Sequence, residues 1–515
     1  MLHQKRLAIL SLGGLLAAYV VCSTILGRFA VTDEVMFKAA GRHWAVTGHF
    51  AAPELKGCVP ADPPVETVYA LYPPVYPFLY GFFTWIVGFG WREAVFYDVF
   101  IHAALVAATI AYGYQYDKRF LGVLGTALAI ALLPQGNQGR PDDLGMLFAM
   151  LGLCCLAHDT RPFLGAFLAG GAFGMSCGTS LGTGVLIGLC APPILLTQDR
   201  PLRSRIAVCL VLAITGITAV ALIWLPLLLY YPLAWKQLSA HIARLHGEEA
   251  AGYGSLLSFA WRYGSHRIIL ALSCLAIAAL AFVLQRRLFS TRLWYVLWGG
   301  PIMGIAYLLW FLPGKYTYLW FIMPLLIVAC FITIVRMWSE TPRLSVLSSG
   351  LLLAGTVIAS LPFVKDTLIM LTLPSGQSYA ANARSMMEVI GDGKTVLADN
   401  DAWWLLGDRC QVYCREFSRP DLDQVEFIVR SGNGSGSPGT PFAIDTESRE
   451  YVSKHFMTIC DDLARQPLTL GGVRITRSAY GFGQYILKRR FPTPHAAASP
   501  EGPLESKASY ERVVY

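Results

Sequence analysis

Two pairs of adjacent acidic residues stand directly beside long apolar stretches of the sequence. Asp33 and Glu34 follow the first apolar run, and Asp142 and Asp143 precede a later one. A carboxylate in such a place can accept the proton of a reacting hydroxyl group, or it can bind a divalent cation. Acids are also common in the first turn of a helix, where they interact favourably with the helix dipole. One pair alone fits that structural role, but two pairs beside two apolar runs favour a role in chemistry.

Few basic residues stand in the short loops on the same side of the predicted membrane as the two acid pairs. The stretch FLPGKYTYLWFIMP, residues 311–324, holds Lys315 next to Tyr316, and Arg140 stands two residues before Asp142. A lysine among aromatic residues can simply reach from the bilayer into the headgroup layer. It can also serve as a point charge that binds a phosphate group. Lys315 and, second to it, Arg140 are the candidate phosphate ligands.

The composition indicates the environment of these residues. Of the 515 residues, 55% are hydrophobic and only 14% are charged, with a mean hydropathy of +0.49, whereas soluble domains carry about 25% charged residues. The sequence therefore predicts an all-α polytopic membrane protein. The net charge of +8 comes from basic residues scattered along short loops. That pattern is typical of membrane topology and speaks against nucleic-acid binding.

About eleven stretches approach the ~20 apolar residues that a helix needs to cross a bilayer. The predicted spans are residues 7–27, 94–115, 119–134, 144–157, 162–176, 181–197, 206–230, 267–285, 293–311, 318–335 and 344–362. Residues 75–90 are apolar too, but too few of them follow Pro77 to cross about 30 Å. Their aromatic side chains favour the headgroup level, so we expect a juxtamembrane helix there on the outer surface.

Loop charges support this arrangement with the N-terminus inside. Each expected inner loop carries Lys or Arg; these loops are residues 116–119, 158–161, 198–205, 285–292 and 336–343. The short outer loops hold only Arg140 and Lys315, as the positive-inside rule requires. The sequence thus predicts a multi-pass protein of the cytoplasmic (inner) membrane. The acid pairs, the long loop at 231–266 and the C-terminal domain are expected to face outward.

A soluble pattern replaces the apolar one after residue 362. The predicted strands are TVLAD (395–399), VEFIVR (425–430) and GQYILKR (483–489), with helix-like segments between them. We expect three regions, namely a membrane domain at 1–362, a small α/β domain outside the membrane at 363–492 and a disordered tail at 493–515.

Other patterns carry less weight. DND (399–401) and DLD (421–423) imitate the DxD motif of nucleotide-sugar transferases, but such triplets arise by chance and we set them aside. The cysteines and histidines lack the spacing of a zinc site. A disulfide bond is left open among the cysteines outside the apolar spans, which are Cys58, Cys410, Cys414 and Cys460.

Taken in order, four motifs resemble those of membrane glycosyltransferases of the GT-C superfamily. The motifs are the stretch 33–50, which begins with DE and ends with TGHF, then LYPPVYPFLYG (71–81), RPDD (140–143) and GKYTYLWFIMP (314–324). The most similar branch is that of the dolichyl-phosphate-mannose protein mannosyltransferases and aminoarabinose transferases. The resemblance lies in motif order over about residues 7–335, and the C-terminal domain resembles the outward domain that many members carry.

This resemblance implies an activity and roles for the candidate residues. Members transfer a sugar from a polyprenyl-phosphate donor on the outer face of the membrane. By position, Asp33 matches the catalytic acid, with Glu34 beside it, and Asp142 and Asp143 match the second acidic position. Lys315 and Tyr316 match the basic-aromatic motif near the donor phosphate, with Arg140 a weaker candidate.

The expected reaction is an inverting displacement at the anomeric carbon, with Asp33 as general base and a cation stabilising the leaving phosphate. Asp142 or Asp143 would orient groups around Asp33, hold sugar hydroxyls or bind a divalent cation. Such a cation, held by Asp33, Asp142 and Asp143, is left open, and no other cofactor is implied. The acceptor is a hydroxyl of a lipid, a glycan or a protein. One departure is GMSCGTSLGTG (174–184), where many relatives carry a lysine after the fifth span.

Two other classes of function compete with this interpretation. A transporter or flippase for a glycolipid would bury ionisable residues in the middle of its spans, whereas the centres of the predicted spans are nearly free of charge. A non-catalytic glycan-assembly protein could use the same scaffold, but the intact Asp33, Asp142 and Lys315 argue against a decayed enzyme. We therefore favour the glycosyltransferase.

The substitution Asp33→Asn separates the catalytic role from a helix-capping role. Asparagine caps a helix about as well as aspartate, so a mere cap would tolerate the change. Loss of a general base typically lowers the rate ~10²–10⁴-fold. We expect Asp33→Asn protein to insert and bind lipid donor but to transfer almost no sugar in a radiolabelled transfer assay, with Glu34→Gln as the milder control. Wild-type turnover would remove Asp33 from catalysis.

Overall fold

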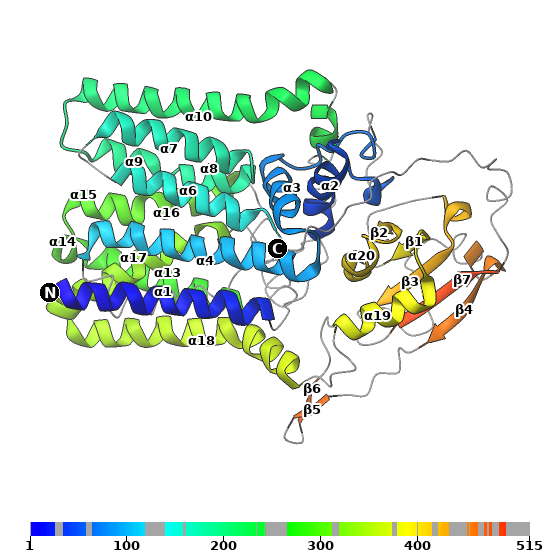
Figure 1. The fold of residues 1–515 in the computed structure, drawn as a ribbon. Helices are drawn as coiled ribbons and strands as arrows, with labels where there is room; N and C mark the ends of the chain where they lie inside the picture. The colour runs from blue at the N-terminus through cyan, green and yellow to red at the C-terminus, as the bar shows by residue number, and fades with distance from the viewer. Residues whose placement is uncertain are drawn as a thin grey trace. The chain divides into compact units, whose positions relative to one another are not determined.

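The computed structural model describes residues 2–25, 34–57, 64–118, 140–157, 161–232, 234–240, 243, 265–311, 319–372, 379–398, 400–414, 421–431, 451–452, 454–461, 468–470, 473–475 and 484–490. The chain divides into two compact units, Met1–Ser375 and Gly376–Tyr515. The first is helical and the second contains a small sheet (Figure 1). The domain boundary expected at residue 362 lies within helix α18 (Pro342–Thr372).

Long helices that run alongside one another build the first unit (Figure 1). In chain order its helices are α1 (Leu2–Ile25), α2 (Glu34–Thr47), the 3₁₀ turn η1 (Pro53–Leu55), α3 (Val75–Val87), α4 (Trp91–Tyr116), α6 (Asp142–Ala157), α7 (Pro162–Cys177), α8 (Leu181–Gly188), α9 (Ala191–Leu196), α10 (Leu202–Tyr230), α13 (Ser265–Val283), α14 (Gln285–Leu288), α15 (Thr291–Trp294), the π-helical η4 (Tyr295–Gly299), α16 (Gly300–Phe311), α17 (Leu319–Glu340) and α18 (Pro342–Thr372).

Length and apolar composition qualify several of these helices as membrane spans. Among the described residues, four are long and apolar enough, namely Trp91–Tyr116, Leu202–Leu229, Trp320–Glu340 and Pro342–Leu361. Shorter apolar helices, among them Ile9–Ile25 and Pro162–Cys177, occupy other expected spans. The span expected at 119–134 lies outside the described residues. The total of about eleven spans therefore stays a prediction.

The span expected at 181–197 is interrupted. Two helices, α8 and α9, occupy this stretch, and α9 begins at Ala191 with a proline at its first turn. Pro192 and Pro193 have no backbone N–H, so neither can continue the hydrogen bonding of a helix that began upstream. The predicted span is therefore present as an apolar helical stretch, Leu181–Leu196, that is divided into two helices.

The expected helix at 75–90 is present as α3, and it packs against α2 through two glycines. Its 13 residues span about 20 Å at ~1.5 Å per residue, too little for a bilayer core. A Cβ placed on Gly41 would lie 1.9 Å from the carbonyl oxygen of Pro77, and one on Gly81 would lie 2.3 Å from that of Gly41. The two backbones therefore touch near the middle of α2. Whether α3 lies on a membrane surface stays a prediction.

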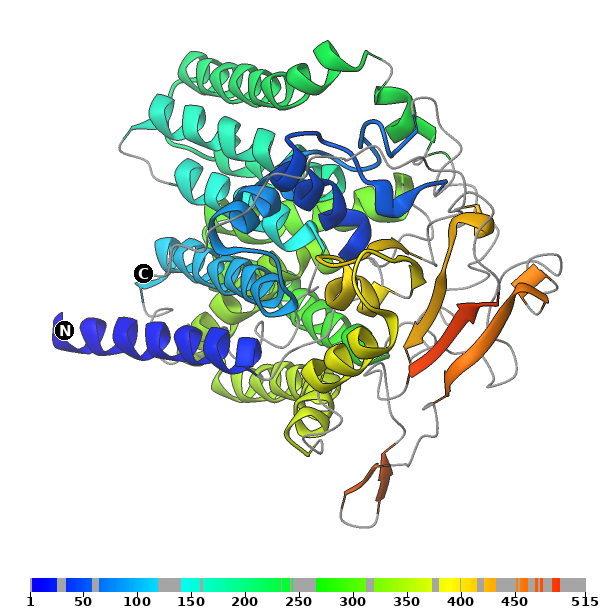
Figure 2. The ribbon, with the colours of Figure 1, turned by 45° about the vertical axis from the view of Figure 1, so that its right-hand side comes forward.

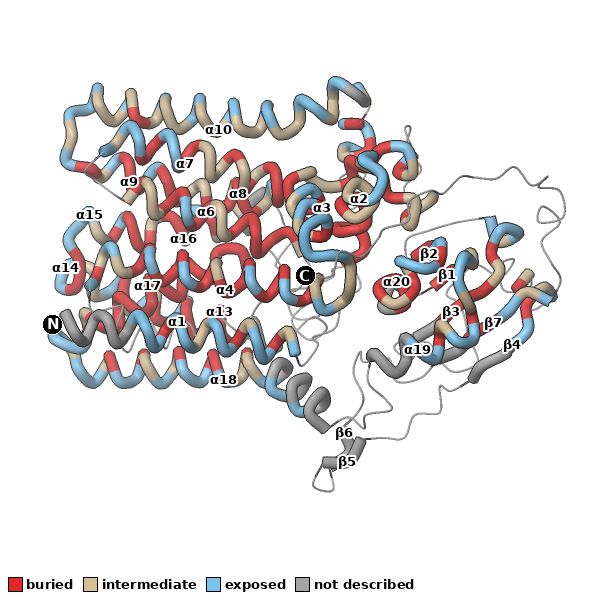
Figure 3. Tube along the Cα trace, viewed as in Figure 1, coloured by how far each residue is buried: buried red, intermediate tan, exposed pale blue. Residues whose placement is uncertain are grey.

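Burial divides the apolar helices into interior and peripheral ones. Helix α17 is buried along nearly its whole apolar length, whereas almost no residue of α10 is buried (Figure 3). In both ribbon views α10 lies at the edge of the unit beside α7 (Figure 2). A Cβ on Gly170 of α7 would lie 2.5 Å from the carbonyl oxygen of Leu212 in α10. Small residues allow this close approach, as is usual between helices in lipid.

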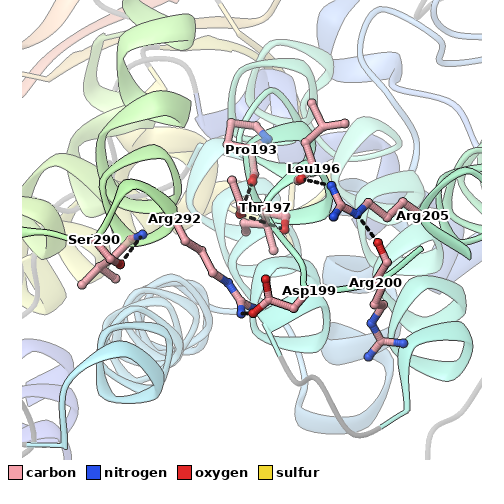
Figure 4. A network of polar contacts seen from close by, with 10 residues as sticks. Pro193, Leu196, Thr197, Asp199, Arg200, Arg205, Ser290 and Arg292 are labelled. Carbon is pink, nitrogen blue, oxygen red and sulfur yellow. Dashed lines mark hydrogen bonds and ion pairs between the residues drawn. The ribbon is translucent and has the colours of Figure 1, made fainter. Parts of the chain in front are cut away.

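Loops predicted on the inner side contact one another. Figure 4 shows Arg292 reaching Asp199, and their Nη1 and Oδ2 atoms lie 3.2 Å apart. In the same view Arg205 donates to the carbonyl oxygens of Leu196 and Arg200. The Nη1 atom of Arg336 donates to the carbonyl oxygen of Leu288 at 3.1 Å. Three of the basic loops therefore share one end of the unit, which agrees with a common side of the membrane.

The segment before α3 is held by a residue far along the chain. The buried amide of Gln237 donates from Nε2 to the carbonyl oxygen of Val68 at 2.9 Å and accepts from the N–H of Ala70 at 2.9 Å. The hydroxyl of Tyr69 donates to the carbonyl oxygen of Met36 in α2. The segment 64–72 thus connects α2 to the helical residues 234–240 of the long loop.

The second unit contains a mixed five-stranded sheet in the order β2-β1-β3-β7-β4. Its elements are α19 (Tyr379–Ile390), β1 (Thr395–Ala398), α20 (Asn400–Leu406), β2 (Gln411–Cys414), the 3₁₀ turn η7 (Leu422–Gln424), β3 (Phe427–Ser431), β4 (Phe456–Asp461), the hairpin β5 (Leu468–Leu470) and β6 (Val473–Ile475), and β7 (Gln484–Arg489). Strand β1 pairs in parallel with β2 and β3, and β7 runs antiparallel to β3 and β4. The three predicted strands are confirmed as β1, β3 and β7.

The DLD triplet has a structural role in this unit. Asp421 caps η7 by accepting from the N–H of Asp423 at 3.0 Å. The hydroxyl of Tyr451 donates to Asp423, and this bond, with the charge of Arg489, lowers the pKa of Asp423 below its usual value. Both acids are thus engaged by the chain itself. Asp399 of the DND triplet lies outside the described residues.

Two of the four cysteines outside the apolar spans, Cys410 and Cys414, are buried in the second unit. The thiol of Cys410 donates to the carbonyl oxygen of Gly391, with sulfur and oxygen 3.3 Å apart. Cys58 and the side chain of Cys460 lie outside the described part of the chain. A disulfide among the four candidates therefore stays a prediction.

The α2–α3 contact predicts a strong difference between two glycine substitutions. Gly41→Ala would press a methyl group into the backbone of α3, and such overpacking costs typically ~1–3 kcal/mol. Gly171→Ala in α7 meets nothing within 4 Å and should be neutral or stabilising by helix propensity. Thermal unfolding in one detergent should show a lower Tm for Gly41→Ala only. Equal Tm values would contradict the tight crossing.

Candidate active site

Helix α2 begins with a charged turn that is buried. Glu34 is 3% exposed and Lys38 is 0% exposed. One turn apart on the helix, the Nζ atom of Lys38 and the Oε2 atom of Glu34 lie 3.5 Å apart. Lys38 also forms an ion pair with Asp98 of α4. A buried lysine is stable only beside opposite charge, so this turn is fixed by its two carboxylate partners.

Asp98 receives a second hydrogen bond from α3. The hydroxyl of Tyr76 donates to its Oδ1 atom at 2.7 Å, while Lys38 approaches Oδ2. Burial and the charge of Asp98 raise the pKa of Tyr76 well above its usual value, so the phenol stays protonated and donates. Three helices, α2, α3 and α4, therefore meet at one carboxylate.

The second acid pair opens α6 and is also buried. Asp142 is 5% exposed, and its Oδ2 atom lies 3.0 Å from the Nε atom of Arg140. The hydroxyl of Ser180 donates to Oδ1 of Asp142 at 2.9 Å, and Thr183 donates to Ser180 at 2.9 Å. Gly145 allows this approach, because a Cβ there would lie 3.1 Å from Cβ of Ser180.

The hydroxyl groups around Asp142 come from the stretch at 174–184. This stretch contains no lysine, and Ser180 is the residue that contacts the carboxylate directly. The positive charge beside Asp142 comes from Arg140, whose side chain is 36% exposed. A cation is therefore present at this carboxylate, although it comes from a different part of the chain.

Asp143 faces α4. Its Oδ2 atom lies 2.9 Å from Nδ1 of His102, one turn after Asp98. Its Oδ1 atom is buried and has no hydrogen-bond partner within the part of the chain that the structure describes. Asp143 and Asp98 also interact electrostatically. A buried carboxylate oxygen without a partner is costly, and this one is available to a ligand hydroxyl.

Glu34 of the first acid pair and both acids of the second pair lie at one end of the helical unit. The guanidinium group of Arg140 lies 5.6 Å from the ring centroid of Phe37, which stands between Glu34 and Lys38 on α2. The ring of Phe37 in turn packs edge-on against Tyr72 at 4.6 Å. Figure 1 shows α2 and α3 beside the ends of α4 and α6. Acids more than a hundred residues apart in sequence thus share one cluster.

The structure describes some of the predicted site residues and leaves others out. Glu34, Arg140, Asp142 and Asp143 are brought together. Asp33, Lys315 and Tyr316 lie outside the described residues, so their assigned roles stay predictions. Asp33 directly precedes Glu34, the first residue of α2.

Sequence reasoning missed the residues that pair with the acids, namely Lys38, Asp98, His102 and Tyr76. A signal for them existed. Asp98 and His102 are four residues apart within the apolar span of α4, and ionisable residues inside a span mark functional sites by default. Lys38 is likewise one turn from Glu34 on a helix whose neighbouring positions are apolar. Ionisable residues therefore occur within the first half of this span, near the end of the unit that holds the acid cluster.

Comparisons with known proteins show distant similarity in the backbone only. No protein-family model matches the sequence, and no curated protein matches it. An archaeal oligosaccharyltransferase, AglB from Archaeoglobus fulgidus in complex with an inhibitory peptide and a dolichol-phosphate, has a TM-score of 0.45 and 11% identity over 82% of this chain and 69% of that chain. The Archaeoglobus fulgidus oligosaccharyltransferase tethered to an acceptor peptide has a TM-score of 0.47 and 12% identity over the same shares, 82% and 69%.

A mycobacterial arabinofuranosyltransferase, AftD, has a TM-score of 0.47 and 14% identity over 92% of this chain but only 40% of that chain. These scores and identities are too low to assign a fold family or an activity. The proposal below therefore depends on the site and the sequence.

Asp98 and Asp199 offer a matched test of the buried ion pair. Asp98→Asn leaves Lys38 buried beside one carboxylate fewer, and breaking a buried pair typically costs ~3–5 kcal/mol. Asp199→Asn breaks the ion pair between Asp199 and Arg292. The Asp199 side chain is 93% exposed, and exposed ion pairs contribute little to stability. Thermal unfolding of both purified variants should show a large loss of stability for Asp98→Asn alone. Similar small losses would mean that Lys38 does not depend on Asp98.

Proposed function

We propose that this chain is an integral-membrane glycosyltransferase that moves a sugar from a polyprenyl-phosphate donor to an acceptor hydroxyl. The observation that carries the proposal is the convergence of Glu34, at the start of α2, with Asp142 and Asp143, at the start of α6, in one buried cluster with Arg140 beside it. Carboxylates and a cation at one site are the groups that sugar transfer from a phosphate requires. The motif order in the sequence supports the same class.

The reaction is a single displacement that inverts the anomeric carbon. The acceptor oxygen forms the new bond to that carbon while Asp33 takes the hydroxyl proton. The bond between the anomeric carbon and the phosphate oxygen breaks, and its electron pair leaves with the polyprenyl phosphate. Lys315, with Tyr316 beside it, and Arg140 stabilise the phosphate charge. Asp143, through its Oδ1 atom, and Asp142 hold sugar hydroxyls, while Glu34 supports the turn after Asp33.

The partners follow from this chemistry. The donor is a lipid of the membrane, and the acceptor is a lipid, a glycan or a protein with a free hydroxyl. The site faces the outer side of the cytoplasmic membrane, with the N-terminus inside and the second unit outside. The agreement among the basic loops at the opposite end supports this orientation.

A transporter of a glycolipid is the second candidate, and one observation favours it. Asp98 and His102 lie within the apolar span of α4, as ionisable residues of transporters do. Their partners, however, are Lys38 and Asp143 of the same cluster. Reconstitution with a radiolabelled polyprenyl-phosphate sugar separates the two functions. A transferase converts the label to a product without moving intact donor between leaflets.

Lys315→Met tests the donor site in this assay. Methionine keeps most of the apolar stem of lysine and removes its charge, so the KM for the donor should rise with little change in expression. The control is Lys118→Met, which removes the same charge from an exposed residue of a predicted inner loop and should leave KM unchanged. An unchanged KM in Lys315→Met would mean that Lys315 does not bind the donor and only reaches into the headgroup layer of the membrane.

A further inference from the structure

Each described acid of the cluster faces a cationic or imidazole side chain of the chain itself. Lys38 pairs with Glu34 and Asp98, Arg140 pairs with Asp142, and His102 contacts Asp143. Lys38 is the most enclosed of these groups, with 0% of its side chain exposed. Its ammonium group lies between two carboxylates that belong to different helices.

In this arrangement few of the described carboxylate oxygens remain that could bind a divalent cation. Mg²⁺ and Ca²⁺ need several oxygen ligands around one point. Among the described residues no three histidine, cysteine, aspartate or glutamate side chains form such a group. The Oε2 atom of Glu34 and the Oδ2 atom of Asp98 both pair with Lys38, whose own charge would repel a second cation at short range. The described residues therefore do not fit a divalent ion.

We propose that the Lys38 ammonium is the resident cation of this site, in the position where a divalent ion would otherwise bridge Glu34 and Asp98, and that the site works without a bound metal. This proposal rests on the proposed glycosyltransferase function for its catalytic part only. Lys38 is a positioning residue. It lets two carboxylates be buried together and fixes the turn that follows Asp33.

The binding part is tested on the purified full-length protein with Mn²⁺, observed by electron paramagnetic resonance. Wild-type protein should bind no Mn²⁺ at this cluster. Lys38→Met removes the ammonium and leaves two buried carboxylates, so it should gain a Mn²⁺ site and show a Tm that rises when Mn²⁺ is added. The double variant Lys38→Met/Asp98→Asn should lose that site again. The matched control, Lys236→Met at an exposed lysine, should behave as the wild type.

Wild-type binding of Mn²⁺ that disappears in Asp98→Asn would overturn the proposal. So would a Lys38→Met protein that folds and gains no site. If Lys38→Met does not fold, Mn²⁺ binding is measured on Lys38→Arg instead, because this variant keeps the positive charge. Lys38→Arg protein should bind no Mn²⁺, and a Mn²⁺ site in it would contradict the proposal.

The catalytic part is tested by chelation in the sugar-transfer assay. Wild-type turnover should persist in EDTA, whereas residual Lys38→Met turnover should fall in EDTA and recover with Mn²⁺. Wild-type turnover that stops in EDTA and returns with Mn²⁺ would overturn the proposal. Wild-type protein that transfers no sugar under any condition would refute the proposed function instead, and the Mn²⁺ measurements would still decide the role of Lys38.

Discussion

Charge buried among apolar helices must meet opposite charge, because desolvation of an unpaired ion is very costly. The pairing of Lys38 with Glu34 and Asp98 meets this demand, and much of the local structure depends on it. Asp98 fixes the distance from α2 to α4, and Tyr76 adds α3 to the same carboxylate. The glycine contact between α2 and α3 then brings the backbones close enough for these side chains to reach one another. In this region the close packing of the helices and the pairing of the buried charges depend on each other.

The helical unit separates its charges along the direction of its helices. The acid cluster lies at the end where α2 and α6 begin. Loops rich in arginine lie where α6 and α17 end, and they are linked by contacts of Arg292 and Arg336. Between the two ends the helices pack through apolar and small residues. Such a division agrees with a protein whose chemistry is at one membrane surface and whose orientation is set by basic loops at the other.

Sequence patterns predicted the helical framework well because long apolar runs have few other solutions in a membrane. They also predicted β1, β3 and β7, whose apolar and β-branched residues are typical of strands. They failed where the outcome depends on tertiary contacts. The role of Lys38 was missed because a lysine one turn from Glu34 looks like an ordinary surface pair on a helix. Only the approach of α4, with Asp98, makes it a buried cation.

The two hydrogen bonds of Gln237 have a consequence for the order in which the chain is assembled during synthesis. The ion pair of Lys38 with Asp98 joins residues that a ribosome produces early. The carbonyl of Val68 and the N–H of Ala70, by contrast, have their partner 169 and 167 residues later. The segment beside Tyr69 can reach its final state only after α10 has been made and the residues beyond it have emerged. The acid cluster forms its first contacts early in translation, and the loop next to it is completed late.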